Sequence, residues 1–257
     1  MTHVHADQNP STYRLGSNRI LDNLSDADRK TVMSKAQSVP LKIETVLQEQ
    51  DERVQYSYFP TSGLISLLAV MQSGAAVEVG CVGCEGATGL SPLFGETGAA
   101  HRMFVQADGE AIRVPVSELV TAFHASESLR AALLRYSYSM LKLSQQGAAC
   151  NAIHSAEERL ARWLLMVQDR VQCEELQLTH EFLSLMLGVR RATVTVTAGT
   201  LEKAGLIEQL RGKIKILSRT KVQDASCECY EQMAASVNDG VVPNGANTLD
   251  TRVSARN

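Results

Sequence analysis

Residues 178–212 read LTHEFLSLMLGVRRATVTVTAGTLEKAGLIEQLRG. This stretch predicts a short helix that begins after Thr179, a tight turn at Gly188 and a second helix from about residue 190 to residue 204. Glycine suits the turn because it adopts positive φ without steric cost. Two short apolar runs then flank the basic turn Arg211-Gly212-Lys213 and predict a hairpin. This order of elements is typical of a winged helix-turn-helix, a module that binds DNA.

Positive charge is concentrated in the same segment. From residue 188 to residue 221 there are eight Lys and Arg against two Glu, a net charge of +6, whereas the whole chain of 257 residues carries −3. A basic surface binds DNA by neutralising phosphates. One face of the second helix carries Arg190, Arg191, Thr193 and Thr197. The two arginines stand at its N-terminus, the end from which side chains reach base edges in the major groove.

The segment Gly188-Val189-Arg190-Arg191-Ala192-Thr193-Val194 resembles the recognition region of the Crp/Fnr family of bacterial transcription regulators. The resemblance covers roughly residues 18–230. It implies an α+β fold with an N-terminal double-stranded, jelly-roll-like β-roll, a long dimerisation helix and a C-terminal winged helix-turn-helix. The expected division is a disordered N-terminus at 1–17, a β-roll sensor at 18–120, the dimerisation helix at 121–153, the DNA-binding domain at 154–230 and a disordered tail at 231–257.

The resemblance also implies roles for single residues. Arg191 matches a base-reading arginine of the family, while Thr193, His180 and Lys213 match positions that face phosphate. Ala192 and Val196 depart from the best-known members, which carry a glutamate and a second arginine there. Because Val196 offers a methyl group that can meet thymine but cannot pair with guanine, we expect an unusual target sequence.

The β-roll is predicted from short β-type runs between residues 39 and 115 that alternate with turn residues. We expect a hairpin turn at residues 72–75 and a last hairpin that joins residues 104–105 to residues 111–114 across Asp108-Gly109. The glycine-rich stretch 80–89 lies between these hairpins, and we expect its free amides to form a nest for an anion.

Cyclic-nucleotide-binding relatives use that stretch to hold ribose through a glutamate and phosphate through an arginine a short way along. Here the place of the arginine falls on His101, with Arg102 one position off, and a one-residue shift turns a strand side chain to the opposite face. We therefore expect a β-roll whose phosphate-binding residues are degenerate, and a small-molecule effector of unknown identity. The expected effector residues are Glu85, Gly86, Thr88, His101 and Arg102.

The long helical stretch predicted near residues 128–152 repeats apolar residues at three- and four-residue steps. By itself it fits either a helix lying on the β-roll or a dimer seam. The family resemblance favours the dimer, since a two-fold protein reads palindromic DNA. We expect Leu133, Met140 and Leu143 to hold that seam.

The six cysteines suggest neither a disulfide framework nor a metal site. Cys81 and Cys84 form a lone C-x-x-C, which we interpret as two buried thiols, because a closed zinc site needs four ligands. The pair Cys227 and Cys229 is expected in another domain, and the histidines at 101, 124, 154 and 180 are scattered over different elements. We therefore expect no cofactor and no metal.

Composition fits a two-domain cytoplasmic protein. The chain is 44% hydrophobic and 21% charged, and it has neither an apolar run of membrane-spanning length nor a leader at its start. Expected partners are double-stranded palindromic DNA, a second copy of the chain and RNA polymerase, with no membrane. The alternative is a β-roll small-molecule-binding protein or enzyme with a helical interaction module, but no nucleophile and base can be placed together.

Overall fold

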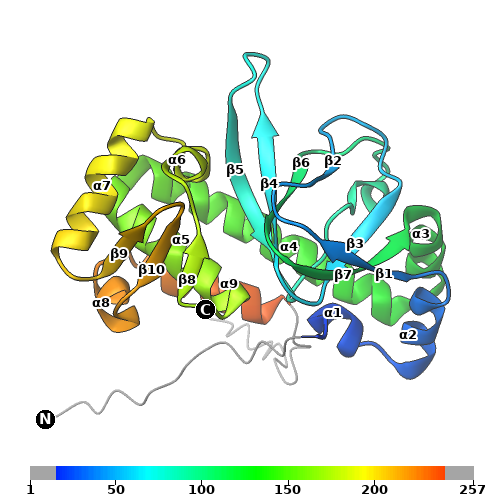
Figure 1. The fold of residues 1–257 in the computed structure, drawn as a ribbon. Helices are drawn as coiled ribbons and strands as arrows, with labels where there is room; N and C mark the ends of the chain where they lie inside the picture. The colour runs from blue at the N-terminus through cyan, green and yellow to red at the C-terminus, as the bar shows by residue number, and fades with distance from the viewer. Residues whose placement is uncertain (1–15, 241–257) are drawn as a thin grey trace, which may run out of the picture.

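The computed structural model describes residues 16–240, so residues 1–15 and 241–257 of the two expected disordered ends lie outside the described range. Two halves lie side by side, with the β-roll in one and a helix-rich C-terminal domain in the other (Figure 1). The long helix α4 (Glu127–Ile153) joins them. The α+β architecture predicted from the sequence is confirmed.

The β-roll consists of two antiparallel sheets. One has the order β1-β7-β3 and the other β2-β6-β4-β5. Their strands are β1 (Gln37–Leu41), β7 (Gly109–Pro115) and β3 (Tyr56–Pro60), then β2 (Val46–Gln48), β6 (Arg102–Ala107), β4 (Leu64–Val70) and β5 (Ala76–Val82). The hairpin expected at residues 72–75 is confirmed, since β4 pairs with β5 around it. The hairpin expected across Asp108-Gly109 is wrong, because β6 and β7 lie in different sheets and the chain crosses between them at this point.

Helices close the roll. The short helices α1 (Arg19–Asp22) and α2 (Asp26–Met33) precede the strands, the 3-10 turn η1 (Ser91–Phe94) interrupts them, and α3 (Val116–Ala125) follows. Ser126 ends α3 and caps α4 through a hydrogen bond from the amide of Leu129, so the long helix starts at residue 127 rather than 121. Phe59, Leu119, Leu129 and Leu133 belong to one core that joins these helices to the roll.

The C-terminal half begins with α5 (Ala156–Val171), which starts with a capping box formed by Ser155 and Glu158. The elements that follow are β8 (Glu175–Gln177), α6 (His180–Leu187), α7 (Arg191–Lys203), β9 (Ile207–Leu210), β10 (Lys213–Ile216) and α8 (Arg219–Asp224). The expected wing is therefore present, with β8 as a third strand in the order β8-β10-β9. The short segment 175–177 carried no strand signal of its own.

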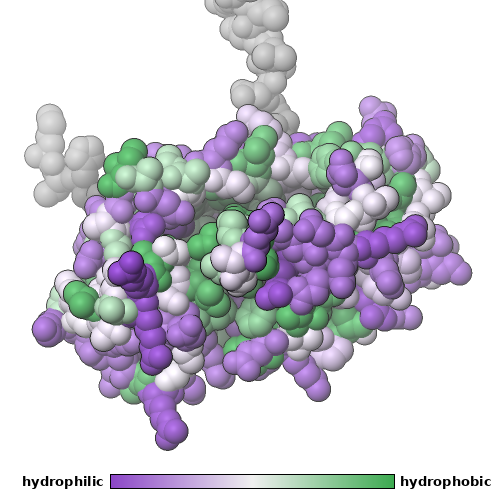
Figure 2. Space-filling view, turned by 90° about the horizontal axis from the view of Figure 1, so that it is seen from above, coloured by the Kyte–Doolittle hydropathy of each residue, from purple (hydrophilic) through white to green (hydrophobic). Residues whose placement is uncertain are grey.

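The two halves share a hydrophobic core. Leu64 and Leu68 of the roll belong to the same cluster as Leu160 and Leu164 of α5. The Phe104 ring of β6 lies 5.9 Å from the Phe182 ring of α6, centroid to centroid. Seen from above, hydrophobic residues gather in the hollow between the two halves and hydrophilic residues cover much of the rest of that face (Figure 2). The halves are thus packed against one another as well as being joined through residues 154–155 between α4 and α5.

The predicted start of the disordered tail at residue 231 is wrong. Helix α9 (Cys229–Asp239) occupies this stretch, and its Met233 and Val237 are buried. Tyr230 helps to fix the helix, because its hydroxyl donates a 2.9 Å hydrogen bond to Asp169 of α5. Between residues 16 and 240, every helix is too short or too polar to cross a bilayer.

Candidate nucleic-acid interface and effector cavity

The helix-turn-helix is built by local sequence as predicted. The Thr179 hydroxyl caps α6 by accepting a 3.1 Å hydrogen bond from the amide of Phe182. Gly188 ends α6 with φ of +62°, a left-handed conformation that lets the chain turn sharply into α7. Buried Val194, Ala198 and Leu201 hold one face of α7 against the core of the domain. Helix α7 lies at the outer edge of the molecule (Figure 1), and its opposite face, which includes Arg191, Thr195 and Val196, is exposed.

The N-terminus of α7 presents two exposed arginines. Arg190 is the N-cap residue of the helix and is exposed. Arg191 is 70% exposed at its side chain, and its ion pair with Glu181 is long, 3.9 Å, and too exposed to hold the guanidinium back from DNA. Val196 is 67% exposed, one turn further along, and Thr193 is half-buried. Thr197 is a correction: only 1% exposed, it packs inside the domain and cannot contact DNA.

Side-chain hydrogen bonds connect the wing, formed by β9 and β10, to helix α7. His180 Nε2 contacts Gln209 Oε1 of β9 at 2.8 Å, and its Nδ1 contacts Thr195 Oγ1 of α7 at 3.1 Å. Gln209 is itself held by Glu202 at 2.8 Å. His180 is therefore half-buried in a network that fixes the angle between helix and wing. Thr195, which the sequence analysis passed over, is exposed beside it.

Lys213 lies at the start of β10, where the wing turns. Its Nζ is 3.3 Å from Glu175 Oε2, and the two side chains are 43% and 48% exposed. Such a surface pair contributes little to stability and can exchange for a phosphate contact. Lys213 and the arginines of α7 thus belong to one module in which a helix and a hairpin present positive charge.

Comparison with known proteins agrees with this geometry. Residues 158–225 match the model of the Crp-like helix-turn-helix domain. This part of the chain therefore carries a Crp-like helix-turn-helix domain. A comparison with curated protein sequences finds no match.

Solved structures carry the likeness over most of the chain. FixK2 from Bradyrhizobium japonicum is 16% identical, with a TM-score of 0.65 over 75% of this chain and 98% of that one. A putative Crp/Fnr regulator from Eubacterium rectale is 17% identical, with a TM-score of 0.64 over 80% and 96%. The c-di-GMP-responsive regulator CLP from Xanthomonas campestris is 15% identical, with a TM-score of 0.61 over 76% and 100%. The second of these structures is described as a putative transcriptional regulator and the third as a global regulator, and the likeness to this chain is one of fold.

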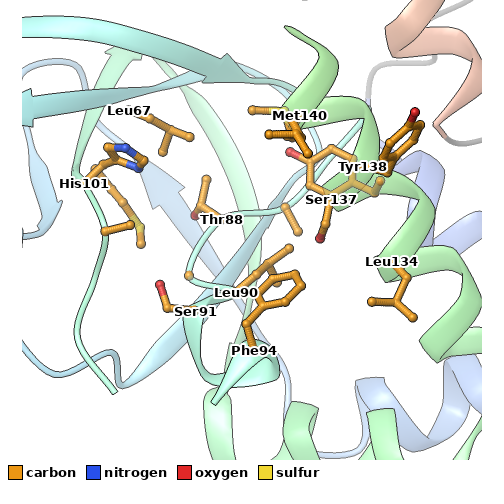
Figure 3. A pocket seen from close by; sticks show the side chains of 16 residues that line it. Leu67, Thr88, Leu90, Ser91, Phe94, His101, Leu134, Ser137, Tyr138 and Met140 are labelled. Carbon is orange, nitrogen blue, oxygen red and sulfur yellow. The ribbon is translucent and has the colours of Figure 1, made fainter. Parts of the chain in front are cut away.

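In this Crp/Fnr-type fold a cavity of about 430 Å³ opens between the roll and α4. Side chains enter it from both sides, with Leu134, Ser137, Tyr138 and Met140 on α4 and Thr88, Leu90, Ser91, Phe94 and His101 on the roll (Figure 3). Among the described residues, none that lines the cavity is Lys, Arg, Asp or Glu. Burial lowers the pKa of His101, so its ring is neutral at neutral pH. The cavity is an uncharged, mainly apolar site of a size typical for small ligands.

Only Thr88 and His101 of the five expected effector residues line this cavity. Gly86 lies behind it, where a Cβ would overlap the ring of Tyr136. Arg102 points elsewhere, because its Nε donates a 2.7 Å hydrogen bond to Glu49. Glu85, Gly86 and Arg102 therefore do not line this cavity. Arg102 faces away from it because neighbouring positions on a strand point to opposite faces of the sheet.

Glu85 instead forms an ion pair with the C-terminal half of the protein. Arg170 of α5 donates a 2.7 Å hydrogen bond from Nε to Glu85 Oε1, and the two side chains are 2% and 4% exposed. Glu85 Oε2 also accepts a hydrogen bond from the amide of Gly83. A second contact lies nearby, where Trp163 Nε1 donates a 2.8 Å hydrogen bond to Glu78 of β5. The glycine-rich turn of the roll is thus fastened to α5.

The outward face of α4 differs from the expected seam. Leu133 is 1% exposed and packs into the core of the roll, so it cannot meet a partner subunit. Met140 and Leu143 are only half-buried. While Ile153 is exposed at the end of α4, the exposed large apolar side chains in the middle of the helix are Leu134, Tyr138 and Leu141, at 46%, 64% and 52%. Their spacing places them on one stripe of the helix, one position along from the stripe chosen from the sequence.

Cys81 and Cys84 are buried in the roll, as interpreted from the sequence. Burial raises the pKa of both thiols to about 12, so they stay protonated and unreactive. Cys227 and Cys229 lie away from this pair, in another part of the fold, as expected. The sequence analysis did not foresee that they meet Cys150 and His154 at the end of α4.

Proposed function

We propose that the protein is a dimeric, sequence-specific regulator of transcription that binds double-stranded DNA in the cytoplasm. The observation that carries the proposal is the exposed N-terminus of α7, where Arg190 and Arg191 stand clear of the protein in a Crp-like helix-turn-helix. A major groove admits one helix, and arginine pairs with guanine through two hydrogen bonds. Lys213 on the wing would contact phosphate, which adds affinity without sequence information.

We further propose that two copies pair along α4. The stripe of Leu134, Tyr138 and Leu141 is apolar and exposed on a helix of 27 residues, as a helix-to-helix seam requires. Pairing would set two recognition helices about 34 Å apart, one turn of DNA, and so favour a palindromic site. RNA polymerase is the expected further partner at a promoter.

The cavity between the roll and α4 is our candidate for the effector site. Leu134, Tyr138 and Leu141 border the cavity and also form the proposed seam, so a ligand there would contact the dimer helices directly. An effector that binds one arrangement of these helices better would shift the spacing of the recognition helices. The uncharged lining favours a neutral, largely apolar molecule over a cyclic nucleotide.

The test is selection of binding sites from random double-stranded DNA with the full chain, followed by mobility-shift titration. The proposal expects a palindrome with two half-sites about one helical turn apart. Selection of no sequence, with equal affinity for all DNA, would contradict it. The variants Arg190→Ala and Arg191→Ala should relax the sequence preference, whereas Arg29→Ala, far along the chain in α2, should leave it unchanged.

A further inference from the structure

A cluster of cysteine and histidine side chains lies apart from both the DNA surface and the cavity. Cys150 belongs to the last turn of α4, and His154 is the residue that ends that helix. Cys227 precedes α9, and Cys229 is its first residue. The four possible ligand atoms all lie within 4.8 Å of one another. The cluster therefore joins the hinge between α4 and α5 to the C-terminal helix.

The spacing of these atoms fits a single metal ion. Cys150 Sγ lies 3.6 Å from Cys227 Sγ, and Cys229 Sγ lies 3.6 Å from His154 Nδ1. Thiolate and imidazole ligands at about 2.3 Å and about 2.0 Å from a tetrahedral zinc are separated from one another by about 3.5–3.8 Å. Two of the six separations thus match those around a single ion, and all four donor atoms lie within 4.8 Å of one another.

Neighbouring side chains orient the donors. His154 Nε2 donates toward Glu228 Oε2 at 3.1 Å, which leaves the lone pair of Nδ1 facing the sulfur atoms. A carboxylate behind a histidine is the usual outer shell of a zinc site. Gln146 Nε2 donates a 3.1 Å hydrogen bond to Cys229 Sγ.

Other uses of the cluster fit less well. A disulfide between Cys150 and Cys227 would leave a third thiol and an oriented histidine without a role. An iron–sulfur cluster spreads its thiolates over several iron atoms and needs ligands further apart than these. Magnesium and calcium take oxygen ligands, which this group lacks. Three sulfurs and one imidazole are the donors of a structural zinc site.

We propose that Cys150, His154, Cys227 and Cys229 bind one Zn²⁺ ion in a closed tetrahedral site. Binding displaces the three thiol protons, and the resulting complex has no open position for a substrate. The cysteines are buried and His154 is 13% exposed at its side chain, so the ion is screened from solvent. Its effect is to clamp α9 onto the end of α4 and so to hold the hinge that carries the DNA-binding domain.

The first test is metal analysis of the full chain, purified without a polyhistidine tag and under reducing conditions. We expect about one zinc per chain, and X-ray absorption should find three sulfur neighbours at about 2.3 Å and one nitrogen at about 2.0 Å. Reduced protein that takes up no zinc after dialysis against the ion would overturn the proposal. Zinc bound to a different set of ligands would overturn it as well.

The second test uses variants with Zn²⁺ affinity as the readout. Cys227→Ser should abolish binding, and Cys173→Ser, which alters an exposed cysteine outside the cluster, should leave it unchanged. Because Cys227→Ser risks misfolding, Glu228→Ala provides an independent variant, as Glu228 is 69% exposed at its side chain. Loss of this outer-shell carboxylate should weaken binding about 10-fold to 100-fold. Equal affinity in the parent chain, Cys227→Ser and Glu228→Ala would refute the site.

Discussion

Replacing Arg170 by Met should strongly destabilise the packing between the two halves. Arg170 and Glu85 are both almost fully buried, with 2.7 Å between Nε and Oε1. Met keeps most of the aliphatic volume but removes the charge that offsets the buried carboxylate. Removal of one partner of a buried ion pair costs about 3–5 kcal/mol. For a chain of this size, each kcal/mol lowers Tm by about 2–4 °C, so a fall of roughly 6–20 °C is expected.

Urea unfolding of Arg170→Met, Glu85→Gln and the double variant measures the coupling between the two side chains. The double variant should be more stable than Arg170→Met, because the stranded carboxylate is gone. The matched control is Arg29→Met, whose pair with Asp22 at 3.2 Å is 50% and 34% exposed and should be worth about 1 kcal/mol or less. The ion pair does not hold the halves together if Arg170→Met lowers the free energy of unfolding no more than this control. The same conclusion follows if the effects of Arg170→Met and Glu85→Gln on that free energy are additive in the double variant.

Three further predictions concern pH, assembly and the effector. Burial raises the pKa of Glu78 from 4.5 to about 7. The folded state therefore holds a proton that the unfolded state has lost, and stability falls as pH rises through this window by up to about 3 kcal/mol. Glu78→Gln should remove the fall in urea unfolding, and parallel pH curves for both proteins would contradict this. Leu141→Asp should give a monomer by light scattering, while a persistent dimer would rule out the exposed stripe as the seam. Cyclic AMP should produce no binding heat at micromolar concentration in calorimetry, since no cation lines the cavity; a micromolar Kd would refute the neutral-ligand proposal.

The sequence predicted the elements whose structure is determined locally. Thr179 as a cap, Gly188 with positive φ and the capping box of Ser155 follow from backbone chemistry within one turn, and all are present. The crossing at Asp108 was missed because sheet pairing depends on distant strands rather than on the turn between two neighbours. Helix α9 was missed because its apolar residues are few and its burial comes from α4 and α5.

In the candidate site, too, local features could be predicted and distant contacts could not. The exposure of the two arginines was predictable, since both stand at the N-terminus of α7 on its polar face. Thr197 was predicted to face DNA but is buried, whereas its neighbour Val196 is exposed. A shift of one residue along a helix is enough to move a side chain from the exposed face to the core. The partners of Glu85 and of the cysteine cluster lie 85 and 77 residues away along the chain, and single-sequence patterns carry no information about such contacts. Only the spacing of Cys150 and His154, one helical turn apart, was a signal that could have been found.

Binding of a selected site and of random DNA across a salt series tests the central claim most directly, with Arg191→Ala and Lys213→Ala compared to the parent chain. Arg191 should contribute about 1–3 kcal/mol of discrimination through a guanine edge, so its loss should collapse the ratio of specific to random affinity. Lys213 should contact phosphate alone, so its loss should weaken all sequences alike and make the salt slope shallower by about 0.9. If Arg191→Ala leaves the ratio intact, α7 does not read DNA and the assignment of the interface is wrong.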